Sequence, residues 1–321
     1  MSRQLEERPL TATSPGQLLW VVVALAAMLL VASPASSQEP TLLRGPYFGQ
    51  APPGGTPVLF APDSFQDPGE YHSPVVFSPD GTEAYWSPMP GHGRNTTLMS
   101  RMVDGVWTSQ RYVDFGLEAG ATEVAFSPDG GTIFFLSKQV LEGEHLAPGE
   151  RPELERIWYA PRTSDGIGTP RPMPELVAYP THWQFSVAAS GNLYFTSRGR
   201  GEPDIYVVPF EGTAYSEPRP LGIEINSDDG EDCPFIAPDE SYLIFTRNDR
   251  EHYNPDLFIS YRGSEGSWTE AVRLPSPINS EDTEIYPVVT PDGEYLFFLS
   301  WREGAGRIFW VEADFLGREI R

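Results

Sequence analysis

A turn phrase that recurs five times constrains this chain more than any other feature. It reads VVFSPDG, VAFSPDG, VAASG, FIAPDE and VVTPDG, at a spacing of about 50 residues. Proline presets φ, aspartate bonds its own backbone and glycine takes a positive φ, so each copy predicts a tight turn in which the aspartate is structural. The turn residues are Asp80, Asp129, Ser190, Asp239 and Asp292.

Each turn lies between two short apolar runs. The second runs, such as TIFF and YLFF, are apolar at consecutive positions, so both faces of those strands must be covered. A third run, a second hairpin turn and a fourth short strand follow. Four strands per repeat predict an all-β protein, a β-propeller of four-stranded blades.

The number of copies predicts five blades. Six blades is the alternative, if residues 38–72 contain a degenerate blade. The last repeat supplies three strands, and we expect the lone N-terminal strand in residues 56–62 to close the ring, which protects the sheet edges. The expected parts are a signal peptide (1–37), a linker (38–55), the propeller (56–315) and a C-terminal tail (316–321).

The repeated F-S-P-D-G followed by an aromatic strand resembles the WD40-like repeats of the TolB family of periplasmic β-propellers. The phrases YFGQAPPGGTPVLFAP and IAPDESYLIFTR are similar to a bacterial group of exported proteins in that superfamily. The resemblance covers roughly residues 46–314. It implies the propeller fold and an exported protein; it does not imply one activity, because the superfamily includes partner-binding proteins and peptidase propellers.

The N-terminal segment predicts export. Residues 18–32 are apolar, but a membrane span needs about 20 residues, and the small residues of SPASSQ follow as at a signal-peptide cleavage site before Gln38. We therefore expect a periplasmic or secreted protein, with an uncleaved membrane anchor as the alternative. Cys233 is the only cysteine, so the chain has no intramolecular disulfide.

The charge balance excludes one class of partner. The formal net charge is −23, and a surface this acidic repels phosphate backbones and anionic lipid. We therefore expect no nucleic-acid partner, and a membrane contact only through an uncleaved anchor.

Aligning the repeats on the turn residue predicts a site at one mouth of the channel. Six positions before the turn lie Pro74, Glu123, Gln184, Cys233 and Tyr286, and eight positions before it lie His72, Ala121, His182, Glu231 and Glu284. The catalytic candidates are Glu123, Glu231 and Glu284. The ligand-binding candidates are His72, His182, Trp183, Arg198, Asp232, Arg247 and Arg302.

Two functions follow from this prediction. The first is a binding or scaffold module that takes a protein or saccharide ligand at the channel mouth. The alternative is a carbohydrate-active hydrolase or lyase, since two carboxylates that flank a bond can serve as acid and base or nucleophile. We expect Glu231→Gln to leave the stability nearly unchanged.

The sequence predicts no cofactor. The acidic run at 226–232 offers oxygen ligands of the kind that Ca²⁺ prefers, and its weak candidates are Asp228, Asp229 and Glu231. A plain acidic turn is the alternative interpretation of that run.

Overall fold

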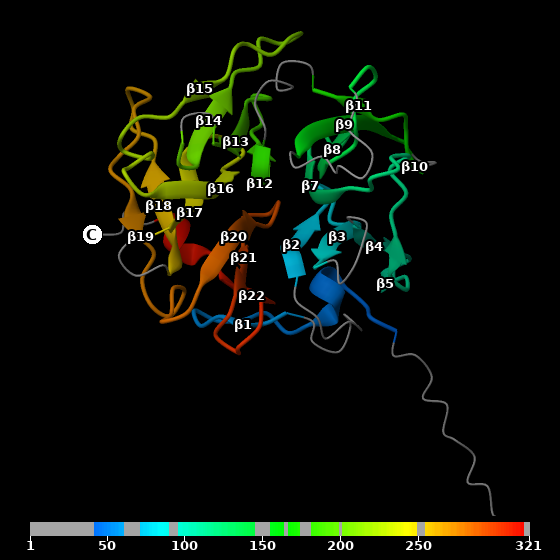
Figure 1. Cartoon of the computed structure of the whole chain (residues 1–321). Coiled ribbons are helices and arrows are strands. Elements are labelled where there is room, and N and C mark those ends of the chain that lie inside the picture. Colours follow the sequence, from blue (N-terminus) through cyan, green and yellow to red (C-terminus); the bar gives the residue numbers. More distant parts are fainter. Residues whose placement is uncertain are drawn as a thin grey trace, which may run out of the picture. The chain divides into compact units, whose positions relative to one another are not determined.

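β-Strands make up almost all of the regular structure of this chain (Figure 1). The computed structural model describes residues 42–60, 71–89, 96–144, 155–163, 166–173, 181–198, 201–248 and 254–317, without the side chain of His182. The predicted signal peptide and the first residues of the predicted linker lie outside these ranges. Within them, no helix is long and apolar enough to cross a membrane.

Five antiparallel sheets form a ring, each with its first strand innermost (Figure 1). Each inner strand contacts the inner strands of both neighbouring blades, and the last contacts the first, so the ring is closed. The prediction of five blades is confirmed. The inner strands are β2 (Tyr71–Phe77), β7 (Thr122–Phe126), β12 (Thr181–Val187), β16 (Gly230–Ile236) and β20 (Glu284–Val289).

The second and third strands of each blade form the core between the blades. Every residue of β3, β13 and β21 is buried, as expected for strands that neighbouring sheets cover on both faces. The second strands are β3 (Glu83–Pro88), β8 (Thr132–Ser137), β13 (Leu193–Ser197), β17 (Tyr242–Asn248) and β21 (Tyr295–Ser300). The third strands are β4 (Leu98–Val103), β9 (Arg156–Thr163), β14 (Asp204–Val208), β18 (Pro255–Tyr261) and β22 (Arg307–Glu312).

Short strands form the outer edges of the first four blades. In each of the first two blades, two such strands pair with the third strand; the next two blades have one each. These strands are β5 (Val106–Trp107), β6 (Arg111–Tyr112), β10 (Gly166–Ile167), β11 (Arg171–Pro172), β15 (Arg219–Pro220) and β19 (Val272–Arg273).

The N-terminal strand closes the ring, as predicted. β1 (Val58–Leu59) pairs with β22 and is the outer strand of the fifth blade. A short 3₁₀ segment before it, η1 (Pro46–Gly49), places Tyr47 against Phe77 of the first blade and Trp310 of the fifth. A second such segment, η3 (Asp314–Gly317), ends the described chain.

The repeated aspartates have the structural role that their turn chemistry predicts. Asp80 Oδ1 accepts hydrogen bonds from Ser78 Oγ at 2.6 Å and from the Thr82 amide at 3.0 Å. The same arrangement recurs at Asp129 and Asp292. At Asp239 the two hydrogen bonds come from the side chain and amide of Ser241.

Candidate functional site

Irregularities in the inner strands shape the centre of the ring. The pairing of each inner strand with the second strand of its blade shifts register once or twice. In four blades a non-glycine residue there takes a left-handed backbone: Glu123 (φ +55°), Trp183 (+56°), Cys233 (+52°) and Tyr286 (+59°). Such bulges re-aim side chains and concentrate at functional sites, because the strain must be held by the surrounding structure.

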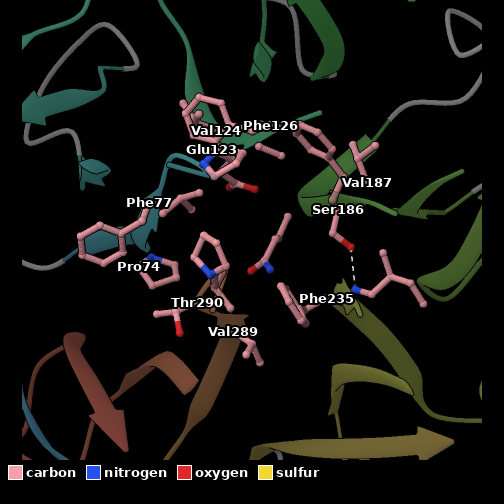
Figure 2. Close-up of a pocket in the computed structure, with 18 of the residues that line it drawn as sticks. Pro74, Phe77, Glu123, Val124, Phe126, Ser186, Val187, Phe235, Val289 and Thr290 are labelled. Carbon is pink, nitrogen blue, oxygen red and sulfur yellow. Dashed lines mark hydrogen bonds between the residues drawn. The ribbon is translucent and has the colours of Figure 1, made fainter. Parts of the chain in front are cut away.

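A cavity of about 330 Å³ lies among the five inner strands (Figure 2). Its lining comes from all five blades and continues to the turn prolines Pro79, Pro128, Pro238 and Pro291. It therefore lies toward the end of the channel that carries the repeated turns, whereas the sequence predicted a site at the opposite mouth, where the inner strands begin. Most of the wall is apolar: Phe77, Val124, Phe126, Phe185, Val187, Phe235 and Val289 are among its members.

Glu123 is the one acidic residue among the described residues that line the cavity. It is 4% exposed, and its Oε1 lies 2.9 Å from Nδ1 of His72 on the neighbouring blade. The contact is a charge contact rather than an in-line hydrogen bond, because neither carboxylate oxygen makes a hydrogen bond of ordinary geometry with a described residue. Burial raises the pKa of Glu123 to about 7, although the contacts with His72 and Tyr286 oppose that rise.

His72 carries the opposite balance. Burial lowers the pKa of His72, but the contact with Glu123 and the negative charge of that carboxylate raise it by more, so the pKa lies above its usual value. The two groups therefore compete for a proton near neutral pH, and among the described residues neither has another ion-pair contact as close. Their protonation states are linked, since a proton on one removes the charge that stabilises the other.

Gln184 is the second polar group that the cavity wall presents. Its Nε2 donates a 2.6 Å hydrogen bond across the channel to the carbonyl of Pro287. That bond fixes the orientation of the amide, because a carbonyl oxygen accepts and cannot donate. Gln184 Oε1 is buried and has no hydrogen-bond partner among the described residues.

Three further titratable groups surround the pair. Burial raises the pKa of Asp232 to about 6 and raises those of Cys233 and Tyr286 well above their usual values. Asn248 donates a 2.7 Å hydrogen bond to Asp232. Cys233 is 1% exposed, and a thiol held protonated by burial is a poor nucleophile. The interpretation of Cys233 as structural is therefore favoured.

Glu231 and Glu284 belong to a different arrangement, which the chain builds twice. Glu231 accepts hydrogen bonds from the Ser227 amide (2.9 Å), Ser227 Oγ (2.6 Å) and Arg247 Nε (2.7 Å). Glu284 accepts them from the amide and hydroxyl of Ser280, from Ser300 Oγ and from Arg302. Both carboxylates are fully buried, and neither lines the cavity.

The repeated phrase INSDDGE and INSEDTE is therefore a structural element. In each copy the asparagine side chain, Asn226 or Asn279, bonds both backbone groups of one residue in the blade's third strand, Ile205 or Leu257. The arginine bonds the backbone of the same loop, at Ile225 O or Ile278 O. The expectation that Glu231→Gln leaves stability nearly unchanged is at odds with this geometry.

The other predicted residues are distributed around the ring. Arg247 and Arg302 hold Glu231 and Glu284. The Arg198 guanidinium lies 5.9 Å from the ring centre of Trp183, a cation–π contact. Neither of these residues lines the cavity, and the side chain of His182 lies outside the description.

The acidic run at 226–232 does not gather metal ligands. In the part of the chain that the structure describes, no group of three or more histidine, cysteine or acidic side chains could hold a metal ion. Glu231 faces Ser227 and Arg247, and Ser227 Oγ also accepts from the Asp229 amide at 3.2 Å. The Ca²⁺ alternative at Asp228, Asp229 and Glu231 gains no support from these contacts.

Sequence reasoning missed the cavity wall and the part that Gln184 plays in it. The alignment placed Gln184 in register with Glu123, but an amide among apolar neighbours carried no chemical signal of its own. A usable signal was present: in four of the five repeats the fourth residue before the turn is a polar or polarisable side chain inside an otherwise apolar strand, namely Glu123, Gln184, Cys233 and Tyr286; the first repeat has Pro74 there.

No protein-family model and no curated protein sequence matches the chain. A solved TolB candidate from Agrobacterium tumefaciens is similar in structure, with 19% identity, a TM-score of 0.52, and 78% of this chain and 80% of that chain covered. An endo-arabinase from Bacteroides thetaiotaomicron matches with 12% identity and a TM-score of 0.48 over 76% and 94% of the two chains. A periplasmic gluconolactonase from Pseudomonas aeruginosa matches with 13% identity and a TM-score of 0.41 over 74% and 70%.

At these identities the comparisons show a fold and no activity. The likeness to the TolB candidate is therefore one of fold. The chain is a five-bladed β-propeller with TolB-like structural similarity.

Proposed function

We propose that the protein is a binding module and that its channel cavity takes a small, mostly apolar molecule. One observation carries this proposal: all five blades contribute to one apolar cavity whose wall presents two buried acceptor groups, the Glu123 carboxylate, which contacts His72, and the Gln184 Oε1, which has no hydrogen-bond partner among the described residues. Apolar cavities with a few converging polar groups are the common form of small-molecule sites. Buried acceptors without partners are costly in a protein that binds nothing there.

The cavity supports binding better than glycoside hydrolysis. Hydrolysis of that kind needs two carboxyl groups about 5–9 Å apart on either side of the scissile bond. Among the described lining residues Glu123 is the only acid, and the aromatic side chains are phenylalanines. The other two catalytic candidates, Glu231 and Glu284, are occupied by arginine and serine partners.

The wall also favours an apolar ligand over the saccharide that the sequence predicted. A sugar presents hydroxyl groups on all sides and needs many donors and acceptors in the wall. Here Ser127 and Thr290 donate to turn aspartates, and Ser186 accepts from the Ile236 amide at 2.8 Å (Figure 2). The polar groups available to a ligand are therefore few.

The proposal includes an exported protein, periplasmic or secreted. Its support is the apolar segment at residues 18–32 and the small residues that follow it. The net charge of −23 argues against nucleic acid as a partner.

A cavity-blocking variant tests the proposal. Ala125 is half-buried and lines the cavity, so Ala125→Phe fills part of the space, while Ala125→Ser leaves it open. We expect 2-phenylethanol to give a saturation-transfer NMR signal with the wild-type protein and with Ala125→Ser, and a much weaker signal with Ala125→Phe. We expect cellobiose to give none.

Two results would overturn the binding proposal: no signal from the aromatic probe with the wild-type protein, or an equal signal with the blocked variant. Circular dichroism verifies that Ala125→Phe is folded. Val187→Phe, from the next blade's part of the wall (Figure 2), is the second blocking variant if the first does not fold.

A further inference from the structure

We propose that the preferred ligand of the cavity carries an ammonium group, which Glu123 and Gln184 accept, on an apolar aliphatic or aromatic body. This inference rests on the proposed function and narrows it to a class of ligand. It follows from the kind of polar atoms that the cavity wall presents, their burial, and the charge of the molecule.

The buried polar atoms in the cavity wall that make no hydrogen bond of ordinary geometry are acceptors, and one of them, Glu123 Oε1, contacts His72. Both carboxylate oxygens of Glu123 and the Oε1 of Gln184 are buried and make no hydrogen bond of ordinary geometry with a described residue. The Gln184 amide cannot turn to offer its NH₂ group, because that group is bonded to Pro287. A ligand that satisfies these atoms must supply N–H or O–H donors.

The two acceptors come from equivalent places on adjacent blades. Glu123 and Gln184 each lie four residues before the residue that begins the turn of their blade, Ser127 and Ala188. Both line the same cavity. A primary ammonium has three N–H donors on one atom, so it can bond both side chains at once.

Charge distinguishes an ammonium from a neutral donor. Glu123 is the acidic group in the described wall, and the protein as a whole carries a net charge of −23, which raises the local concentration of cations. Besides each other, the described titratable groups that interact with Glu123 or His72 are Cys233, Tyr286, Glu155 and Lys138. The two cationic groups among these described residues each contact an acid already, His72 with Glu123 and Lys138 with Glu155, so they favour a cationic ligand over an anionic one.

The apolar side chains of the cavity wall determine the chemistry that we expect for the rest of the ligand. Phe77, Phe126, Phe235 and Val289 line the same cavity as Glu123 (Figure 2). Hard metal cations prefer several oxygen ligands and water, which this wall does not provide. An apolar body gains free energy from burial here at about 25 cal/mol per Å² of apolar surface.

Three compounds of similar shape and different charge test the inference: 2-phenylethylamine, 2-phenylethanol and 3-phenylpropionate. Isothermal titration calorimetry of the purified protein at pH 8 gives their affinities. We expect the amine to bind at least about ten-fold more tightly than the alcohol, and the carboxylate to bind most weakly, because a buried charge without its partner is strongly disfavoured.

Two substitutions assign the preference to the proposed groups. In Glu123→Gln the amine should lose its advantage, so that the ratio of amine to alcohol affinity falls to about one. Gln184→Leu should weaken the amine more than the alcohol, and it serves as the second variant if Glu123→Gln does not fold. Glu265→Gln changes an exposed acid in a turn and should leave the ratio unchanged.

The outcomes separate the two proposals. If the alcohol binds as tightly as the amine, or if Glu123→Gln and Gln184→Leu keep the wild-type ratio, the ammonium inference is wrong while the binding module stands. If none of the three compounds binds the wild-type protein, the proposed function fails and the inference fails with it.

Discussion

At the residue scale, two kinds of buried acid occur in this ring, and they differ in their partners. Glu231 and Glu284 receive several hydrogen bonds each from serine and arginine. Glu123 interacts with His72 and Tyr286, without a serine or arginine donor, and lines an apolar cavity. Fully bonded carboxylates are structural, whereas a buried carboxylate without such bonds is a candidate for ligand binding.

The first prediction concerns the structural acids. Glu231→Gln removes the charge that pairs with Arg247 at 2.7 Å in a fully buried position. We expect the free energy of unfolding to fall by about 2–4 kcal/mol, because breaking a buried pair leaves its partner uncompensated. Urea denaturation measures the change, and Glu284→Gln should give a similar loss. A loss below about 0.5 kcal/mol in both variants would show that these networks do not stabilise the fold.

The second prediction uses the pKa of Glu123. Its folded-state pKa of about 7 lies above the usual 4.5, so between these values the folded state binds a proton that the unfolded state has released. Stability from this group is present at low pH and is lost as pH rises through about 7. Glu123→Gln removes this loss of stability. It also removes the contact that raises the pKa of His72, and a raised histidine pKa likewise makes the wild-type protein less stable as pH rises.

We therefore expect the unfolding free energy of Glu123→Gln, relative to the wild-type protein, to rise between pH 4.5 and 7.5. We expect this rise to exceed about 1.4 kcal/mol, which is the free energy that corresponds to a shift of one pKa unit. Chemical denaturation at several pH values measures it, with Glu265→Gln as the matched control. A flat or falling difference would mean that Glu123 is not held in the environment described here.

At the scale of elements, the N-terminal segment holds the first and last blades together. Phe60, directly after β1, is 2% exposed and lies 4.8 Å from the ring of Phe297 and 5.2 Å from that of Trp310. Its amide donates to Ile308 O at 2.9 Å, which extends the pairing of β1 with β22. Closure of this kind removes the free edge of the last sheet.

The third prediction tests the closure. Phe60→Ala removes a buried aromatic ring, and we expect the free energy of unfolding to fall by about 3–5 kcal/mol. Val58→Ala, two residues away on β1, changes a side chain that is 39% exposed and should cost less than about 1 kcal/mol. Equal effects of the two substitutions in thermal or urea unfolding would argue against a closing role for this segment.

The strands and turns could be predicted from the sequence because each is a local pattern. Consecutive apolar residues and Pro-Asp-Gly turns recur with each blade, and those patterns do not depend on distant residues. The bulges could not be predicted in the same way. Their left-handed residues are of four different types: Glu123, Cys233, Tyr286 and Trp183. In the third blade the left-handed residue, Trp183, also lies one position earlier relative to the turn than in the other three blades.

The candidate site was predictable in part. Register alone brought Glu123 and Gln184 to equivalent positions on neighbouring blades. Register could not separate Glu123 from Glu231 and Glu284, because their difference depends on the serine and arginine side chains that approach each carboxylate. Nor could it tell which end of the channel holds the cavity, since that depends on side-chain volumes summed over five strands.

At the scale of the whole molecule, the ring brings the five inner strands together around one shared cavity. No single blade forms the cavity; residues of all five inner strands contribute to its wall. The size and polarity of the space are therefore properties of the closed ring, and the closure at β1 and the cavity wall are coupled through the packing of neighbouring blades.

The most direct test is a crystal structure of the protein soaked with 2-phenylethylamine. We predict electron density for the aromatic ring among Phe77, Phe126 and Phe235, with the nitrogen within hydrogen-bond distance of Glu123 and Gln184. Density for the compound only elsewhere on the molecule, or inner strands that leave no space among the five blades, would contradict the account.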